Sequence, residues 1–216
     1  MTVRRAACPS CGANVEFLWS SAVQTTCPFC RSVLVRHDVD LTRVGVVGDL
    51  PPDASPIQRG TEGRWRGRAF TVVGRIIYEH DRGAWNEWHL RFADADESGW
   101  LSDAQLEYAV SRLAAFQGLP LEATRAKVGQ TIRHDDELLT VTTTTRARYR
   151  GVEGELPFEY WDKRDVLFVD LRSATGAFAT VDYSESPPLL FVGEFVRFAD
   201  LGLRNLRAFE GWPTPA

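Results

Sequence analysis

Apolar and polar residues alternate with a period of two over several stretches beyond residue 60. In residues 87–92, three large apolar side chains take one phase, and charged residues or histidine take the other. This alternation is typical of a strand with one buried face. We expect Trp88 to point into a core and His89 to point outward on a polar sheet face. The stretches 70–78 and 140–145 are rich in β-branched residues and also predict strands.

The segment Leu106–Phe116 fits two patterns. Ser102 and the residues after it can form a capping box, followed by apolar residues at helical spacing. The same residues also alternate as a strand does, and the corresponding residues 188–193 of the repeat described below are strand-like. A strand is therefore favoured here, and short helices are predicted only at 121–128 and 199–209.

An internal repeat organises this part of the chain. Residues 60–72 return without gaps at 129–141, an offset of 69 residues, with glycine, arginine and a strand-like tripeptide at equivalent places. A fixed offset of this size indicates a duplicated supersecondary unit. We predict a mainly β fold with little helix, in which a small β-barrel- or sandwich-like unit is duplicated over 60–128 and 129–210.

Four cysteines are the clearest chemical signal. They form two C-x2-C pairs with 15 residues between them, at Cys8, Cys11, Cys27 and Cys30. This spacing is typical of a structural zinc site, in which four thiolates fill a tetrahedral shell and leave no open position. The alternative is two disulfides. The first residues carry no apolar segment of a secretory signal, so a reducing compartment, and hence metal, is favoured.

Residues 1–36 are therefore predicted to be a zinc ribbon that holds structural Zn2+. Prolines mark residues 37–59 as an extended linker. The ribbon and the β region are expected to fold as separate units, because so small a ribbon cannot bury a core without metal.

Charge is unevenly distributed. The 216-residue chain has a net charge of -4, but residues 1–36 carry four arginines against one glutamate, which is +3, so the rest carries -7. By charge, the β region is not a nucleic-acid surface, whereas the basic ribbon could contact phosphates. No stretch reaches the 18 apolar residues of a membrane span.

The sequence contains no recognisable catalytic set, and we expect a protein that is not an enzyme. Trp85, near a turn, and His89 are candidate contacts for a partner. Glu153 and Glu155 could line a pocket for a cationic ligand, or they could protect an edge strand from aberrant pairing. The segment Asp94–Gly99 opens like a calcium loop but lacks the glutamate at position twelve, so a hairpin turn is favoured.

Four motifs taken together resemble one bacterial family: Thr71–Ile76, Trp85–Leu90, Gly99–Ser102 and Glu153–Pro157. They resemble the bacterial domain-of-unknown-function family 4178. The resemblance implies an N-terminal zinc ribbon and supplies no catalytic residue. Through the genes that neighbour members of the family, it also implies a membrane-associated, envelope-stress complex.

The expected function is a non-catalytic, zinc-binding adaptor or scaffold that binds other proteins. Its partners are expected to be membrane-associated. Its location is expected to be cytoplasmic, with a peripheral position at the inner membrane face as part of the same hypothesis. Two alternatives stay open: nucleic-acid binding through the basic ribbon, and a sensor or enzyme for a small cationic ligand such as a polyamine.

Overall fold

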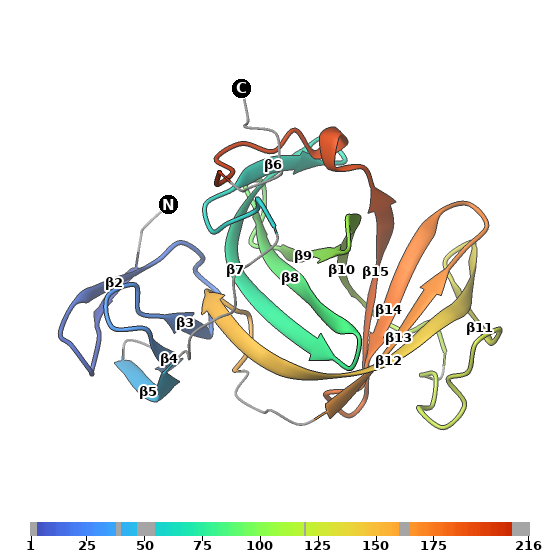
Figure 1. Cartoon of the computed structure of the whole chain (residues 1–216), viewed down its shortest axis with the longest axis horizontal. Helices are drawn as coiled ribbons and strands as arrows, with labels where there is room; N and C mark the ends of the chain where they lie inside the picture. Colours follow the sequence, from blue (N-terminus) through green and yellow to red (C-terminus); the bar gives the residue numbers. More distant parts are fainter. Residues whose placement is uncertain (1–3, 38–39, 47–54, 119, 160–164, 209–216) are drawn as a thin grey trace.

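The computed structural model describes residues 4–37, 40–46, 55–118, 120–159 and 165–208 (Figure 1). These residues contain fifteen strands and one short 3-10 turn, η1 (Phe198–Leu201). The predicted mainly β fold with little helix is confirmed. A small N-terminal group of strands, blue in Figure 1, lies beside a larger sheet that closes on itself.

The N-terminal unit, within residues 4–46, consists of two small antiparallel sheets. β1 (Arg4–Ala7) pairs with β2 (Asn14–Phe17), and β3 (Gln24–Thr26), β4 (Ser32–His37) and β5 (Asp40–Val46) form the second sheet. β5 lies within the segment predicted as a linker. Residues 40–46 therefore belong to this sheet, where they cover the edge that β4 would otherwise expose. Residues 47–54 of the predicted linker lie outside the described residues.

The remaining strands form one antiparallel sheet. In chain order they are β6 (Glu62–Trp65), β7 (Arg68–His80), β8 (Gly83–Phe92), β9 (Ser98–Ala104), β10 (Glu107–Ala114), β11 (Thr131–His134), β12 (Glu137–Gly154), β13 (Asp165–Arg172), β14 (Ala177–Asp182) and β15 (Leu189–Val196). Eight of them follow one another in a ring, β7-β8-β9-β10-β15-β14-β13-β12, and pairing of β12 with β7 closes it. Closure removes the open edges that a flat sheet would expose.

The ten strands are two copies of one five-strand unit. β6 to β10 and β11 to β15 follow the same order, and the first two strands of each copy begin 69 residues apart. The backbone repeats as well. The amide of Gly60 donates to the Val72 carbonyl at 2.8 Å, and that of Gly129 donates to the Val141 carbonyl at 2.9 Å. Both long strands carry a bulge directly after this point.

The two copies do not close separately. β7 pairs with β12 and β10 pairs with β15, so each copy supplies four strands to one shared ring. The two β units predicted at 60–128 and 129–210 are thus interlocked halves of a single barrel. The physical reason is that each half alone leaves two long strands with unpaired backbone groups.

The ambiguous segment 106–116 is a strand for most of its length. β9 and β10 are joined by a tight turn at Gln105 and Leu106, whose φ angles are 52° and 70°. Positive φ at both central residues is what a two-residue type I′ hairpin turn requires.

The predicted helices are wrong within the described residues. Residues 121–126 make isolated i to i+3 turns, and η1 is the only helical turn near 199–208. Leu121 and Ala126 instead pack over the outer face of the second copy. Burial of these side chains therefore decides the backbone path here, rather than their helical spacing.

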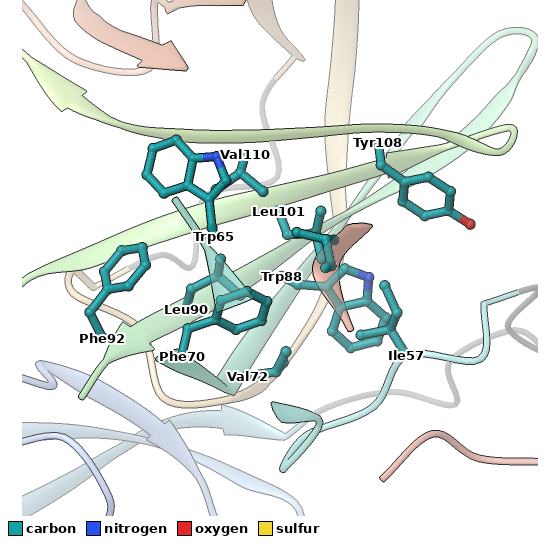
Figure 2. Packing of buried hydrophobic residues seen from close by; sticks show 11 residues of the cluster. Ile57, Trp65, Phe70, Val72, Trp88, Leu90, Phe92, Leu101, Tyr108 and Val110 are labelled. Atoms are coloured by element: carbon teal, nitrogen blue, oxygen red, sulfur yellow. The ribbon is translucent and has the colours of Figure 1, made fainter. Parts of the chain in front are cut away.

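Each copy buries its outer face under its own short strand and nearby loops, and in the first copy the segment after β15, with Phe198 and Leu201, also covers this face. Figure 2 shows Trp88, Leu90 and Phe92 of β8 clustered with Trp65 of β6. The second copy has an equivalent cluster around β12 to β15. The predicted core position of Trp88 is confirmed. The opposite face of these strands lines the interior of the ring. Both sets of alternating side chains are therefore covered by protein over much of the sheet.

Candidate functional site

The four cysteines converge on one point of the N-terminal unit. The Sγ atoms of Cys8 and Cys30 are 3.7 Å apart, those of Cys11 and Cys27 are 3.8 Å apart, and all four lie within 4.8 Å of one another. A tetrahedral ion with bonds of about 2.3 Å places its sulfurs about 3.8 Å apart, whereas a disulfide requires about 2 Å. The cysteines are therefore free thiols whose spacing fits a metal ion.

Two matching turns bring the thiols together. In each turn, the fourth residue after the first cysteine donates its amide to that cysteine's carbonyl, Gly12 to Cys8 at 2.8 Å and Arg31 to Cys27 at 3.0 Å. Both donors have positive φ, 74° and 61°. Glycine adopts this conformation readily. At Arg31 the strain is about 1–2 kcal/mol, which the second turn needs in order to place its thiols.

The N-terminal unit is docked on the barrel. The Glu155 carboxylate accepts hydrogen bonds from the backbone amides of Leu18 at 2.6 Å and Trp19 at 2.8 Å. Beside it, the amide of Leu156 donates to the Gln24 carbonyl at 2.9 Å, and the amide of Gln24 donates to the Leu156 carbonyl at 3.2 Å. The N-terminal unit and the barrel therefore share a packed, hydrogen-bonded contact, and their folding as separate units stays a prediction.

Glu153 and Glu155 do not share a pocket. Gly154 between them has a φ of 67°, which breaks the strand geometry that would place both on one face. Glu153 is partly exposed and pairs with the buried Arg75 at 3.3 Å. Glu155 is buried against the N-terminal unit, where desolvation raises its pKa despite the hydrogen bonds from two amides. Their chemistry is structural: one carboxylate pairs with a buried arginine, and the other holds two parts of the protein together.

His89 is fully buried, so the prediction that it points outward is wrong. Its ring lies between Trp19 of the N-terminal unit and Trp100 of β9, with centroid distances of 5.0 and 4.9 Å. The Nδ1 atom is 2.8 Å from the carbonyl oxygen of Glu155. Burial lowers the pKa of His89 to about 4. The ring is therefore neutral at pH 7, with its proton on Nδ1.

The acidic segment Asp94–Gly99 spans the β8–β9 turn, as the favoured hairpin interpretation predicts. Arg68 donates two hydrogen bonds to Asp94, each of 2.8 Å, and Ser21 donates one of 2.6 Å to Asp96. Protein donors thus already hold these oxygens. Among the residues that the structure describes, only the four cysteines form a cluster with metal-ligand spacing.

The interior of the ring holds a cavity of about 510 Å³. Its wall is largely aromatic, formed by Tyr78, Trp85, Trp100, Phe158, Phe168, Phe178, Phe191 and Phe195. Trp85 stacks on Tyr78 with a centroid distance of 5.1 Å and meets Phe168 edge-on at 5.6 Å. Trp85, predicted as a contact for a partner protein, is therefore half-buried and belongs to this wall.

Three half-buried or buried carboxylates also line the cavity, Glu87, Asp170 and Asp182, beside the exposed Glu107. Glu87 accepts hydrogen bonds from the Ser102 hydroxyl at 2.8 Å and from the Trp85 indole N–H at 2.9 Å. Desolvation nevertheless raises the pKa of Glu87 to about 7, and the charges of the two aspartates add to this effect. Desolvation raises the pKa of both aspartates as well. The cavity wall therefore gathers acidic groups whose ionised forms are disfavoured by burial.

Replacing Glu87 should stabilise the protein at alkaline pH. Because the pKa of Glu87 is raised in the fold from 4.5 to about 7, its contribution is fully present below pH 4.5 and is lost as pH rises through 7. Glu87→Gln mimics the protonated form. We expect its free energy of unfolding to exceed that of the wild type by up to about 3 kcal/mol at pH 8 and by less than about 0.5 kcal/mol at pH 4. Urea denaturation at both pH values measures this, and an equal difference at both would contradict it.

The sequence analysis missed these three carboxylates. Each lies in a strand whose alternate residues are apolar. The alternation places Glu87 on a polar outer face, and no local pattern distinguishes Asp170 or Asp182. The signal that could have found them is the repeat: when both copies carry acids or aromatic residues on the same phase, closure of the copies turns that phase inward.

Comparison with curated proteins finds no match, and comparison with solved structures finds none either. No helix among the described residues has the length and apolar character needed to cross a membrane. The family model for a domain of unknown function, DUF4178, matches residues 58–198, which is more than half of the chain and contains all strands of the ring, so this protein belongs to the DUF4178 family.

Proposed function

We propose that this protein is a non-catalytic binding protein that holds a small organic molecule inside its ring of strands. The observation that carries the proposal is the cavity of about 510 Å³. Pockets for small molecules typically have 300–1,000 Å³, mostly apolar and aromatic walls, and a few polar groups that orient the ligand. Here the polar groups are the three carboxylates and the hydroxyls beside them.

The metal site serves this function indirectly. We propose that the ion is Zn2+, because four thiolates at tetrahedral spacing suit a soft, closed site. Four thiolates leave no position for a substrate, so the ion would hold the N-terminal unit in shape. That unit in turn packs against His89, whose other neighbour, Trp100, lines the cavity.

A matched pair of substitutions on β12 tests the binding function. Thr145 lines the cavity, whereas its neighbour Thr144 is exposed. The probe is N-phenyl-1-naphthylamine, a dye whose fluorescence rises in apolar surroundings. We expect saturable binding of one dye per chain. Thr145→Trp should weaken it at least tenfold, because the indole occupies the space, and Thr144→Trp should not change it.

Two results would overturn the proposal. One is the absence of saturable dye binding to the folded wild type. The other is equal binding to both variants, which would place the dye elsewhere on the protein. Circular dichroism of each variant shows that the comparison is made between folded proteins.

An adaptor that binds other proteins is the second candidate. One observation favours it: Phe29, in the second cysteine turn, is 70 % exposed. A large aromatic side chain on a rigid turn is suited to anchoring a partner. The cytoplasmic location and a membrane-associated partner belong to this second proposal. Nucleic-acid binding is less favoured, because Arg5 pairs with Glu16 at 2.6 Å and Arg36 donates to the Ser20 carbonyl at 2.8 Å.

A further inference from the structure

The charged residues of the cavity wall come from opposite sides of the ring. Glu87 is on β8, whereas Asp170 and Asp182 are on β13 and β14. In the order of the eight strands, β8 and β14 are four places apart, which is half of the ring. The two walls therefore present carboxylates across the cavity from each other. The charges of Asp170 and Asp182 raise the pKa of Glu87, which agrees with this arrangement.

The wall carries a clear excess of negative charge. Its acidic and basic residues are the three carboxylates, Glu107 and Arg172, which is a formal charge of -3 when histidine is not counted. Arg172 is paired with Glu107 at 3.2 Å and lies over the ring of Phe195 at 4.1 Å. Arg172 also lowers the pKa of Asp170, but less than burial raises it. The wall's own cation therefore compensates for only part of this charge.

The hydrogen bonds to the three carboxylates come from neutral groups in the part of the chain that the structure describes. Glu87 accepts from Ser102 and Trp85, and the backbone amide of Ser184 donates to Asp182 at 2.7 Å. The side chain that bonds Asp170 is Thr180, again neutral. Carboxylates whose hydrogen-bond donors are all neutral are costly when ionised in surroundings of low polarity. A ligand that brings a positive charge would remove that cost.

The aromatic walls favour the same kind of ligand. Tyr78, Trp85 and Phe168 form one cluster, with Phe168 edge-on to Tyr78 at 4.8 Å, and Phe178 meets Phe195 edge-on at 5.0 Å. The faces of aromatic rings attract cations and also pack against apolar groups. An inorganic cation would use the carboxylates but leave these apolar walls without a contact.

We propose that the cavity binds a small organic cation, with an ammonium group between Glu87 and the two facing aspartates and its apolar part against the aromatic wall. This inference rests on the proposed binding function and names the class of ligand. An aryl amine and an aliphatic polyamine share this chemistry, and the experiment separates them.

The test measures displacement of the dye by probes of similar shape and different charge. They are 2-phenylethylamine, its neutral counterpart 2-phenylethanol and the anion 3-phenylpropionate, with spermidine as the polyamine. We expect at least one of the two amines to bind tenfold or more tightly than the alcohol, and the anion not to bind. If spermidine exceeds the aryl amine, a polyamine is indicated; the reverse order indicates an aryl amine.

Substitutions of single carboxylates test which of them contact the ammonium group of the ligand. Glu87→Gln should weaken binding of the preferred amine at least tenfold and leave the alcohol within twofold. Glu62→Gln removes a carboxylate on the exposed face of β6 and should change neither. Asp170→Asn provides a second test from the opposite wall, with the same expected loss, and decides the matter if Glu87→Gln does not fold.

The outcomes separate this inference from the function on which it rests. If the dye and the alcohol bind but the amines show no preference, the cavity is a binding site and the cationic class is wrong. Tighter binding of the anion, or unchanged amine affinity in both carboxylate variants, would overturn it in the same way. If neither dye nor probes bind, the proposed function itself fails.

Discussion

Removal of the proposed zinc ion from the four-cysteine site should unfold the N-terminal unit and loosen the end of the barrel that it covers. Structural zinc contributes on the order of 10–16 kcal/mol to small modules, which otherwise have too little core to fold. Chelation should abolish amide protection over residues 8–35 in hydrogen exchange. Protection should also fall at Leu156, whose amide donates to Gln24. Strands β13 to β15 should keep their protection, because they lie in the second half of the ring and pair only within it and with β10.

Cys27→Ser should reproduce the effect of chelation, because a hydroxyl replaces one of four thiolates. Ser10→Ala is the matched control: it changes an exposed residue of the first cysteine turn that is not a ligand. Unchanged protection of residues 8–35 after complete metal removal would contradict the prediction. Loss of amide protection across the whole ring would mean that the barrel does not stay folded without the N-terminal unit.

Trp88→Ala should destabilise the barrel by about 3–5 kcal/mol, as deletion of a buried aromatic side chain does. Trp88 is fully buried in the outer cluster of the first copy (Figure 2). The Arg75 guanidinium lies 4.7 Å from its ring, so the substitution also removes one of the contacts of a buried cation. Urea denaturation at pH 7 measures the change in the free energy of unfolding.

Phe29→Ala is the control for size, because it truncates an aromatic side chain that is largely exposed. Its effect on the free energy of unfolding should stay within about 0.5 kcal/mol. A comparable loss in both variants would mean that the N-terminal unit buries Phe29 in solution. A negligible loss of unfolding free energy for Trp88→Ala would contradict the burial of Trp88 in the outer cluster of the first copy.

The sequence predicts the strands well where a repeat and a clear alternation agree. Residues 87–92 form part of β8, and 106–116 is assigned correctly because its counterpart in the second copy is strand-like. The helix predicted at 121–128 fails for the opposite reason. It rests on local spacing alone, and Leu121 and Ala126 are buried against the second copy, so tertiary contacts decide their backbone.

The candidate site is predictable only in part. The cysteine cluster follows from local spacing, because each pair is held by its own turn. The cavity depends on the pairing of β7 with β12, which joins residues about 70–80 positions apart, and no local pattern encodes that contact. His89 shows the consequence. Its neighbours alternate as in a strand with one solvent-exposed face. Closure of the ring and docking of the N-terminal unit bury that face as well, and His89 with it.

The interlocked halves permit a second way to assemble the same ring. The first half ends in strand edges that only a second half can pair, and nothing in the pairing of β7 with β12 or β10 with β15 requires both halves to come from one polypeptide. Two chains can therefore exchange halves and build two complete rings, a domain-swapped dimer with the same backbone contacts as two monomers. The connection between β10 and β11 would act as the hinge. Its length and the protein concentration would then set the proportion of dimer, without any new surface contact.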